Sequence, residues 1–297
     1  MRNLSYVFAA VIAAVCGAAG SAFAADTAAP LAFLDMHTHM MVEGITPDDE
    51  IVRLKQAGIA RVLLMHPEPE VIAAFAKKYP GFVIPALSIA RPSVKGIHLD
   101  DKTGPLMAAR YASHDICAFG EIPAAGFADG DAMRSIYGAA EASGAPVIVH
   151  TDLANPANIA AVEAATNAYP KMHFILAHLG WTAGPDLIGR LLDAHPNLYT
   201  DVSIRFDPPG SLAWRNEGLD LSILTADGAI PPEWRAVIAR HPDRFLFAMD
   251  INSFGPRYTI TQLLVDTARK ALAPLPRPIQ DAIAHGNGEK LLGGCGG

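Results

Sequence analysis

Eight short apolar runs, alternating with amphipathic stretches of helical length, predict a single-domain α/β fold, a (β/α)8 barrel of the TIM type. The chain has 297 residues, of which 51% are hydrophobic, enough for the core of one barrel. The first apolar run is not followed by the Gly-rich phosphate loop of a nucleotide-binding open sheet. A closed barrel is therefore favoured over a doubly wound sheet.

The predicted elements follow one another regularly. Strands are expected at residues 31–36, 61–65, 82–89, 116–122, 146–150, 173–178, 198–204 and 245–251. Helices are expected at residues 47–57, 68–78, 132–143, 156–168, 185–194, 232–240 and 259–272, several of them starting at Pro or just after Asp or Asn. The long connections 90–105 and 205–231 follow strands, so they would border the active-site face of a barrel as lids or specificity loops.

The N-terminal 24 residues have the pattern of a cleaved signal peptide. Arg2 supplies the positive start, residues 7–19 form an apolar core, and Ala22-Phe23-Ala24 is a small-x-small cleavage site. The apolar stretch is shorter than the ~20 residues of a membrane-spanning helix. We expect signal peptide 1–24, barrel 25–297, and an exported, periplasmic or secreted protein without a stable membrane anchor.

Charge and cysteine content limit the partners. The formal net charge is −7 and no basic run is present, which argues against nucleic acid or an anionic membrane surface as partner. The expected partner is a small-molecule substrate. A homo-oligomer is compatible with the sequence. After cleavage only Cys117 and Cys295 would remain, one in an apolar run and one in a Gly-rich tail. Unpaired cysteines are favoured, with a disulfide as the alternative.

Titratable side chains stand at the ends of five apolar runs: His37 and His39, Glu121, His150, His178, and Asp250. Side chains two apart on a strand share a face, so the first two histidines would project together. A single residue of this kind is ordinarily a hydrogen-bonded histidine or a capped carboxylate. Six of them at one barrel mouth would lose hydration unless they share a cation, so they predict a divalent metal site, with zinc expected.

With these residues the chain resembles the metal-dependent amidohydrolase superfamily and, within it, the amidohydrolase-related (amidohydrolase 2) family. The resemblance spans the mature chain and rests on Asp35-Met36-His37-Thr38-His39, His150, Ala177-His178-Leu179-Gly180, Asp250 and residues 286–292. It implies a barrel hydrolase with a divalent ion on His37, His39, His178 and Asp250, and with His150 as ligand or substrate contact. Asp35 is expected to support the two neighbouring histidines.

Glu121 leaves the number of ions open. The segment Gly120-Glu121-Ile122 is similar to that of the TatD-like hydrolases, in which a glutamate bridges two ions. The alternative is that Glu121 accepts a hydrogen bond and so orients a ligand histidine. Both one and two ions are therefore compatible with the sequence.

The expected reaction is hydrolysis of an amide, ester or lactone-type bond by metal-bound hydroxide. Asp250 would act as general acid and base, and His150 would stabilise the oxyanion if it is not a ligand. The alternative, which the family also implies, is non-oxidative decarboxylation of an aromatic or unsaturated acid. A barrel that binds without turnover is a third hypothesis.

Arginine and tryptophan residues outside the cluster are further candidates for substrate binding. Arg91 and Arg205 follow strands and could pair with a carboxylate, although ordinary loop charges are the simpler interpretation. Trp181, together with Trp214 and Trp234, could line an apolar pocket or simply pack.

Overall fold

The computed structural model describes residues 30–40, 44–90, 94–123, 130–210, 220–252 and 256–295. The predicted signal peptide and the candidates Arg91 and Trp214 lie outside these ranges and stay predictions. Among the described residues, no helix combines the length and apolarity needed to cross a bilayer. Residues from Leu31 onward form one compact unit.

Eight parallel strands form one sheet in which neighbours pair in chain order. They are β1 (Phe33–His39), β2 (Ile59–His66), β3 (Val83–Leu87), β4 (Ala118–Pro123), β5 (Val147–His150), β6 (Phe174–Leu176), β7 (Leu198–Asp201) and β8 (Phe245–Leu246). The chain after β8 returns to β1, since the Met36 amide donates to the Phe247 carbonyl at 3.0 Å and Thr38 bridges Ile251. The barrel prediction is thereby confirmed.

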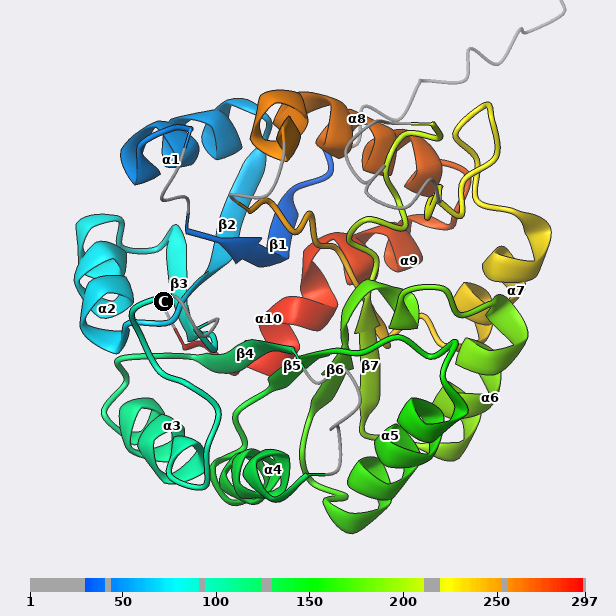
Figure 1. Ribbon diagram of the computed structural model, residues 1–297. Coiled ribbons are helices and arrows are strands. Elements are labelled where there is room, and N and C mark those ends of the chain that lie inside the picture. The colour runs from blue at the N-terminus through cyan, green and yellow to red at the C-terminus, as the bar shows by residue number, and fades with distance from the viewer. Residues whose placement is uncertain are drawn as a thin grey trace, which may run out of the picture. The chain divides into compact units, whose positions relative to one another are not determined.

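In the described part of the chain, eight helices surround the strands as an outer ring (Figure 1). They are α1 (Pro47–Gln56), α2 (Pro69–Lys78), α3 (Thr103–Ala112), α4 (Asp131–Ser143), α5 (Pro156–Ala168), α6 (Pro185–Ala194), α7 (Pro232–Arg240) and α8 (Thr261–Leu272). The further helices α9 (Arg277–Asp281) and α10 (Asn287–Leu292) lie inside this ring, and α10 crosses the middle of the view. Short non-α turns are η1 (Ala177–Gly180), η3 (Pro256–Ile260) and η4 (Ala282–Gly286). The seven predicted helices are found within two residues of their expected ends.

Helix α3 begins inside the segment predicted to be a long connection. Gly104 and Pro105 resemble loop residues, but they lie in its first turn, where the fixed φ of Pro is compatible with a helix. A Cβ at Gly104 would lie 2.2 Å from the Ser135 carbonyl oxygen of α4. The glycine therefore serves the close packing of two helices, which the sequence does not reveal.

Both faces of the strands are buried, which explains their continuous apolar runs. Phe33, Val62 and Leu64 belong to the outer layer between strands and helices. Leu34 and Met36 belong to the barrel interior, where Leu291 and Leu292 of α10 pack with them. Helix α10 thus closes the end of the barrel opposite the active-site face.

The two cysteines form a disulfide, contrary to the favoured prediction. The Sγ atoms of Cys117 and Cys295 are 2.05 Å apart across a sequence separation of 178 residues. Cys117 faces the barrel interior just before β4, and α10 carries the tail underneath it. In the sequence the two cysteines have unlike surroundings, an apolar run and a Gly-rich tail. The pairing was missed because only folding brings the tail to the barrel.

Candidate metal centre

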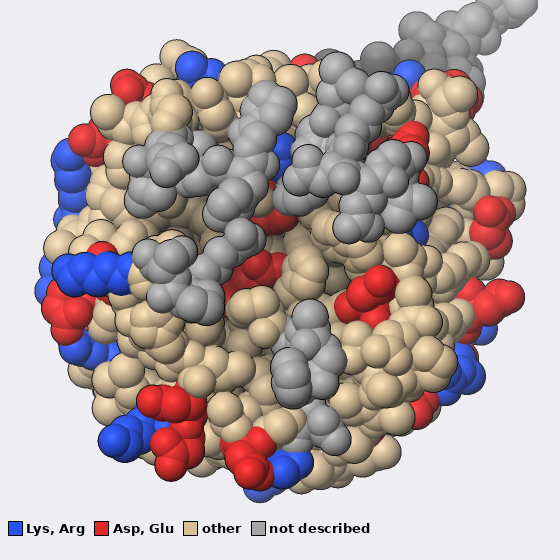
Figure 2. Space-filling view, viewed as in Figure 1, with Lys and Arg blue, Asp and Glu red and all other residues tan. Residues whose placement is uncertain are grey.

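All six predicted ligands converge at the C-terminal ends of the strands. They are His37 and His39 of β1, Glu121 of β4, His150 of β5, His178 just after β6 and Asp250 after β8. Figure 2 shows acidic side chains gathered in a hollow near the middle of this face. The structure thus brings together groups that lie up to 213 positions apart in sequence.

One group of ligand atoms surrounds a common point. Oδ1 of Asp250 lies 3.6 Å from Nε2 of His37 and 3.5 Å from Nε2 of His39. Glu121 oxygens lie 3.7 Å and 3.4 Å from the same two nitrogens. A tetrahedral ion with bonds of ~2.0–2.1 Å holds its ligands roughly 3.3 Å apart. These residues therefore fit a divalent ion, and the buried Nε2 of His37 has no hydrogen-bond partner among the residues that the structure describes.

A second group shares Glu121. Its Oε1 lies 2.7 Å from Nδ1 of His150 and 3.2 Å from Nε2 of His178. The two imidazole nitrogens are 3.1 Å apart. Glu121 thus lies between the two groups and can contribute an oxygen to each.

Charge at the centre favours a cation. Burial alone would lower the pKa of His37, but Glu121 and Asp201 outweigh burial and raise it well above its usual value. Burial would also raise the pKa of Glu121, yet His37, His150 and His178 hold it well below its usual value. The Glu121 carboxylate therefore stays ionised, and positive charge beside it is stabilising.

The strand β1 is irregular where the ligands begin. Its pairing with β2 shifts register between Asp35 and Thr38. Met36 and His37 therefore both face the barrel interior, which strict alternation forbids. Asp35 holds this bend, since it accepts hydrogen bonds from the His37 amide at 3.1 Å and the Thr38 hydroxyl at 2.5 Å. The predicted supporting role of Asp35 matches these contacts.

Asp35 also reaches the other side of the site. Its Oδ1 accepts a hydrogen bond from the Met249 amide at 3.0 Å, next to Asp250. Burial raises the pKa of Asp35 to about 7, against the opposing effect of these hydrogen bonds. One carboxyl group therefore ties β1 to the segment after β8.

Gly120 allows Glu121 to reach the centre. Its φ is +129°, a region that side chains disfavour. A Cβ there would lie 2.5 Å from the Ile148 carbonyl oxygen of β5. Only glycine lets β4 run this close to β5 while presenting the next carboxylate to the metal site.

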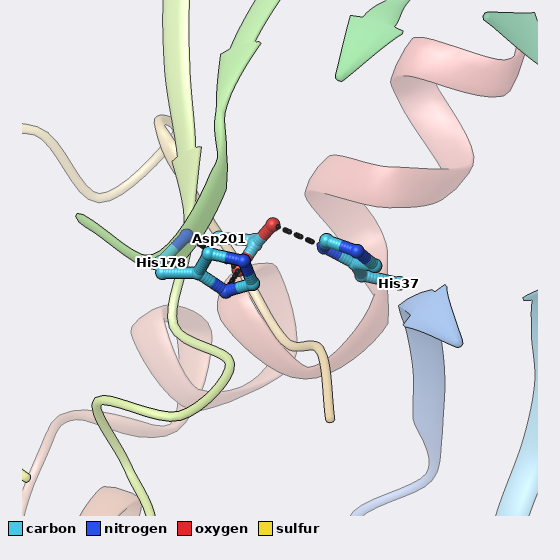
Figure 3. Close-up of side chains that lie close together, drawn as sticks. All are labelled: His37, His178 and Asp201. Atoms are coloured by element: carbon cyan, nitrogen blue, oxygen red, sulfur yellow. Dashed lines mark hydrogen bonds and ion pairs between the residues drawn. The ribbon is translucent and has the colours of Figure 1, made fainter. Parts of the chain in front are cut away.

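Asp201 and Ser203 complete the site and were not predicted. Asp201, at the end of β7, lies between His37 and His178 (Figure 3). Its Oδ2 is 3.1 Å from Nδ1 of His37, and its Oδ1 accepts from the His178 amide at 3.1 Å. Ser203 Oγ lies 2.7 Å from Nδ1 of His178. These contacts leave Nε2 of both histidines for a metal.

The signal for Asp201 was a polar residue at a strand end, the same signal that marked the other ligands. It was missed because the seventh strand was expected to run to residue 204, whereas β7 ends at Asp201. The sixth strand is likewise shorter than expected, and His178 lies in the turn η1 with φ of +56°. Such strained backbone is common at functional sites.

The predicted substrate contacts lie in different places. The Trp181 ring lies against the centre, with its centroid 5.1 Å from that of His150 and 5.5 Å from that of His178. Arg205 is buried outside the ligand cluster, and its Nη2 donates to the Ala183 carbonyl at 3.1 Å. Trp234 is buried in α7 and packs in the outer layer, so it does not line the mouth.

Comparison with known proteins identifies the family. The model of the amidohydrolase family matches residues 24–294, so the chain belongs to this family of metal-dependent hydrolases and is an enzyme. No curated protein sequence matches the chain.

Solved structures agree with the barrel. An uncharacterised TIM-barrel protein from Bordetella bronchiseptica is 16% identical, with 90% of this chain and 100% of that one covered and a TM-score of 0.61. A zinc-bound amidohydrolase from Burkholderia multivorans is 15% identical, with coverage of 88% and 99% and a TM-score of 0.59. A TatD homologue from Escherichia coli is 17% identical, with coverage of 87% and 97% and a TM-score of 0.56. At these identities the likeness concerns the fold.

Proposed function

We propose that the protein hydrolyses an amide, ester or lactone-type bond of a small molecule at a zinc centre. The observation that carries the proposal is the pair of ligand groups, of which Glu121 belongs to one and lies within 3.7 Å of His37 and His39 in the other. His37, His39 and Asp250 would hold one ion, and His150 and His178 a second, with Glu121 shared between them. Bound there, zinc would polarise the scissile carbonyl and lower the pKa of a water toward ~7.

The protein's own groups would then handle the proton and the substrate. Asp250, a ligand through Oδ1 in this arrangement, would also accept the proton of the attacking water and pass it to the leaving group. Asn252 donates a hydrogen bond to Oδ1 of Asp250 at 3.2 Å, which leaves the other carboxylate oxygen for this transfer. Trp181, packed on His150 and His178, would give an apolar wall for the substrate.

Metal analysis and turnover together test this proposal. The purified protein should contain close to two zinc ions, and it should cleave members of a panel of chromogenic esters, lactones and anilides. Asp250→Asn should keep most of the metal and lose turnover, whereas Asp186→Asn in α6 serves as a control that changes neither. Full activity of Asp250→Asn would refute the role of Asp250, and a metal-free active protein would refute the centre.

Decarboxylation remains a second candidate because of Arg205. Its guanidinium is buried, and within the described part of the chain its Nε has no hydrogen-bond partner. Burial lowers the pKa of Arg205 to about 10. A buried cation is costly without a counter-ion, and a substrate carboxylate would supply one. Release of carbon dioxide from a panel of aromatic and unsaturated acids, with no hydrolysis in the ester panel, would favour this function.

We also propose that residues 1–24 are removed on export. The disulfide between Cys117 and Cys295 supports this, because such bonds persist in oxidising compartments. The intact mass of protein recovered from the periplasm or medium tests the proposal. A mass that includes Met1 to Ala24 would refute cleavage.

A further inference from the structure

The peptide unit between Met249 and Asp250 is held at both of its polar ends. The Met249 carbonyl accepts a hydrogen bond from Nε of Arg257 at 3.1 Å and another from Nη2. The Asp250 amide of the same unit donates to the His37 carbonyl at 2.6 Å. Because a peptide unit is planar, these contacts on opposite sides set the direction in which the chain enters Asp250.

Arg257 is itself held rigidly. It is fully buried in η3, and its Nη2 donates to Oδ1 of Asp207 at 2.9 Å while Nη1 pairs with Oδ2. Such a forked pairing of guanidinium and carboxylate fixes the plane of the arginine as well as its position. Asp207 lies after β7, so the arginine links that segment to the backbone before Asp250.

Asp250 needs this support because its backbone is strained. Its φ is +49°, in the left-handed region that residues with a Cβ disfavour. A relaxation to negative φ would turn the carboxylate away from the Nε2 atoms of His37 and His39, which now lie 3.6 Å and 3.5 Å from Oδ1. The surroundings must therefore hold a conformation that the residue would otherwise leave.

We propose that Arg257, anchored by Asp207, is a positioning residue that keeps Asp250 aimed at the metal centre. Arg257 is not a member of the ligand groups, and its hydrogen bonds to the Met249 carbonyl make it act through the peptide unit before Asp250. The inference rests on the proposed centre but not on the reaction, and a probe of metal geometry tests it without any substrate.

The experiment uses Co²⁺ alone as the probe, with the visible absorption and affinity of the cobalt protein as readouts. Arg257→Ala should bind Co²⁺ about 10–100-fold more weakly and show an altered spectrum, as expected when the support of a ligand is removed. Millimolar guanidinium should restore both, because it can occupy the vacated space beside Asp207. Urea, which has a similar shape but no charge, should not.

Two further variants separate positioning from folding. Asp207→Asn keeps Arg257 but weakens the ion pair that anchors it. The cobalt spectrum should therefore change in the same direction as in Arg257→Ala, but by a smaller amount. Arg190→Ala, which removes an exposed ion pair with Glu163, should leave the spectrum unchanged with or without guanidinium. A wild-type cobalt spectrum and affinity in folded Arg257→Ala or Asp207→Asn would overturn the inference while leaving the centre intact. Failure of the wild type to bind Co²⁺ would refute the centre, and this inference with it.

Discussion

The Nδ1 atom of His37 lies 3.1 Å from Oδ2 of Asp201, which joins the first strand of the barrel to the seventh across the metal centre. The same carboxylate accepts a hydrogen bond from the His178 amide. Burial would raise the pKa of Asp201, but the hydrogen bond and charge of His37, together with the charge of His178 and the hydrogen bond of Ser203, hold it below its usual value. Ionised Asp201 therefore keeps the proton of His37 on Nδ1 and directs Nε2 to the ion.

Asp201→Asn is expected to weaken zinc binding by about 10–100-fold, because the amide can present its NH₂ group to Nδ1 and no longer stabilises one tautomer. Competition with a chromogenic zinc chelator measures the affinity. Ser203→Ala removes the hydroxyl contacts to Nδ1 of His178 and to Oδ1 of Asp201 but leaves the pairing of Asp201 with His37, so it is the comparison variant and should have a smaller effect. Unchanged affinity of Asp201→Asn would mean that the pairing with His37 has no orienting role.

Gly120→Ala should damage the centre more than the fold. The new Cβ would meet the Ile148 carbonyl oxygen, and the positive φ adds strain of about 1–3 kcal/mol, so Glu121 should shift. We expect at least tenfold weaker zinc binding by the same chelator assay.

Gly144→Ala is a control for backbone strain alone. Gly144 also has a positive φ, of +77°, but a Cβ there would meet nothing within 4 Å. It should lower the melting temperature by a few degrees and leave zinc affinity unchanged. Equal loss of zinc in both variants would point to general destabilisation instead.

The disulfide should stabilise the fold through the tail. Cys295→Ser is expected to cost about 2–4 kcal/mol, because the bond closes a loop across 178 residues, and to lower the melting temperature by roughly 5–10 °C. Thermal unfolding followed by circular dichroism measures this. Reductant should lower the melting temperature of the wild type toward that of the variant and leave the variant unchanged. Equal melting temperatures without reductant would contradict the prediction.

His195 should make the fold less stable in mild acid. Burial lowers the pKa of this imidazole and Arg190 adds to the effect, while Glu163 opposes it. In the unfolded chain the histidine takes up a proton near pH ~6.5, whereas in the folded protein it stays neutral until a lower pH. Stability from this group is therefore present above that pH and is lost as the pH falls through this window.

The measurement compares melting temperatures at about pH 7.5 and pH 5.5. The melting temperature of the wild type should fall more between these two pH values than that of His195→Gln. In the wild type, Nδ1 of His195 lies 3.0 Å from Oγ1 of Thr166, and the glutamine amide can retain this contact. Both proteins share every other titrating group, so the effect of His195 is the difference between their two decreases in melting temperature. A larger loss in the variant would refute the assignment.

Much of the architecture was predictable because barrel strands are short, buried on both faces and separated by amphipathic helices. Helices α5, α6 and α7 have the bounds expected from their proline starts and apolar periodicity. Helix α3 was missed because Gly104 serves a contact with another helix. The local sequence pattern indicates which secondary structure a segment prefers, but not which residues pack against it.

By itself, the sequence determined the strand-helix alternation and placed His37, His39, Glu121, His150, His178 and Asp250 at strand ends, since both follow from local periodicity and apolar context. Only the tertiary structure decided that Asp201 orients two ligands, that Arg257 holds the peptide before Asp250, and that Cys117 meets Cys295. These contacts join positions far apart in the chain. No local pattern encodes them, because each depends on where barrel closure brings two distant segments together.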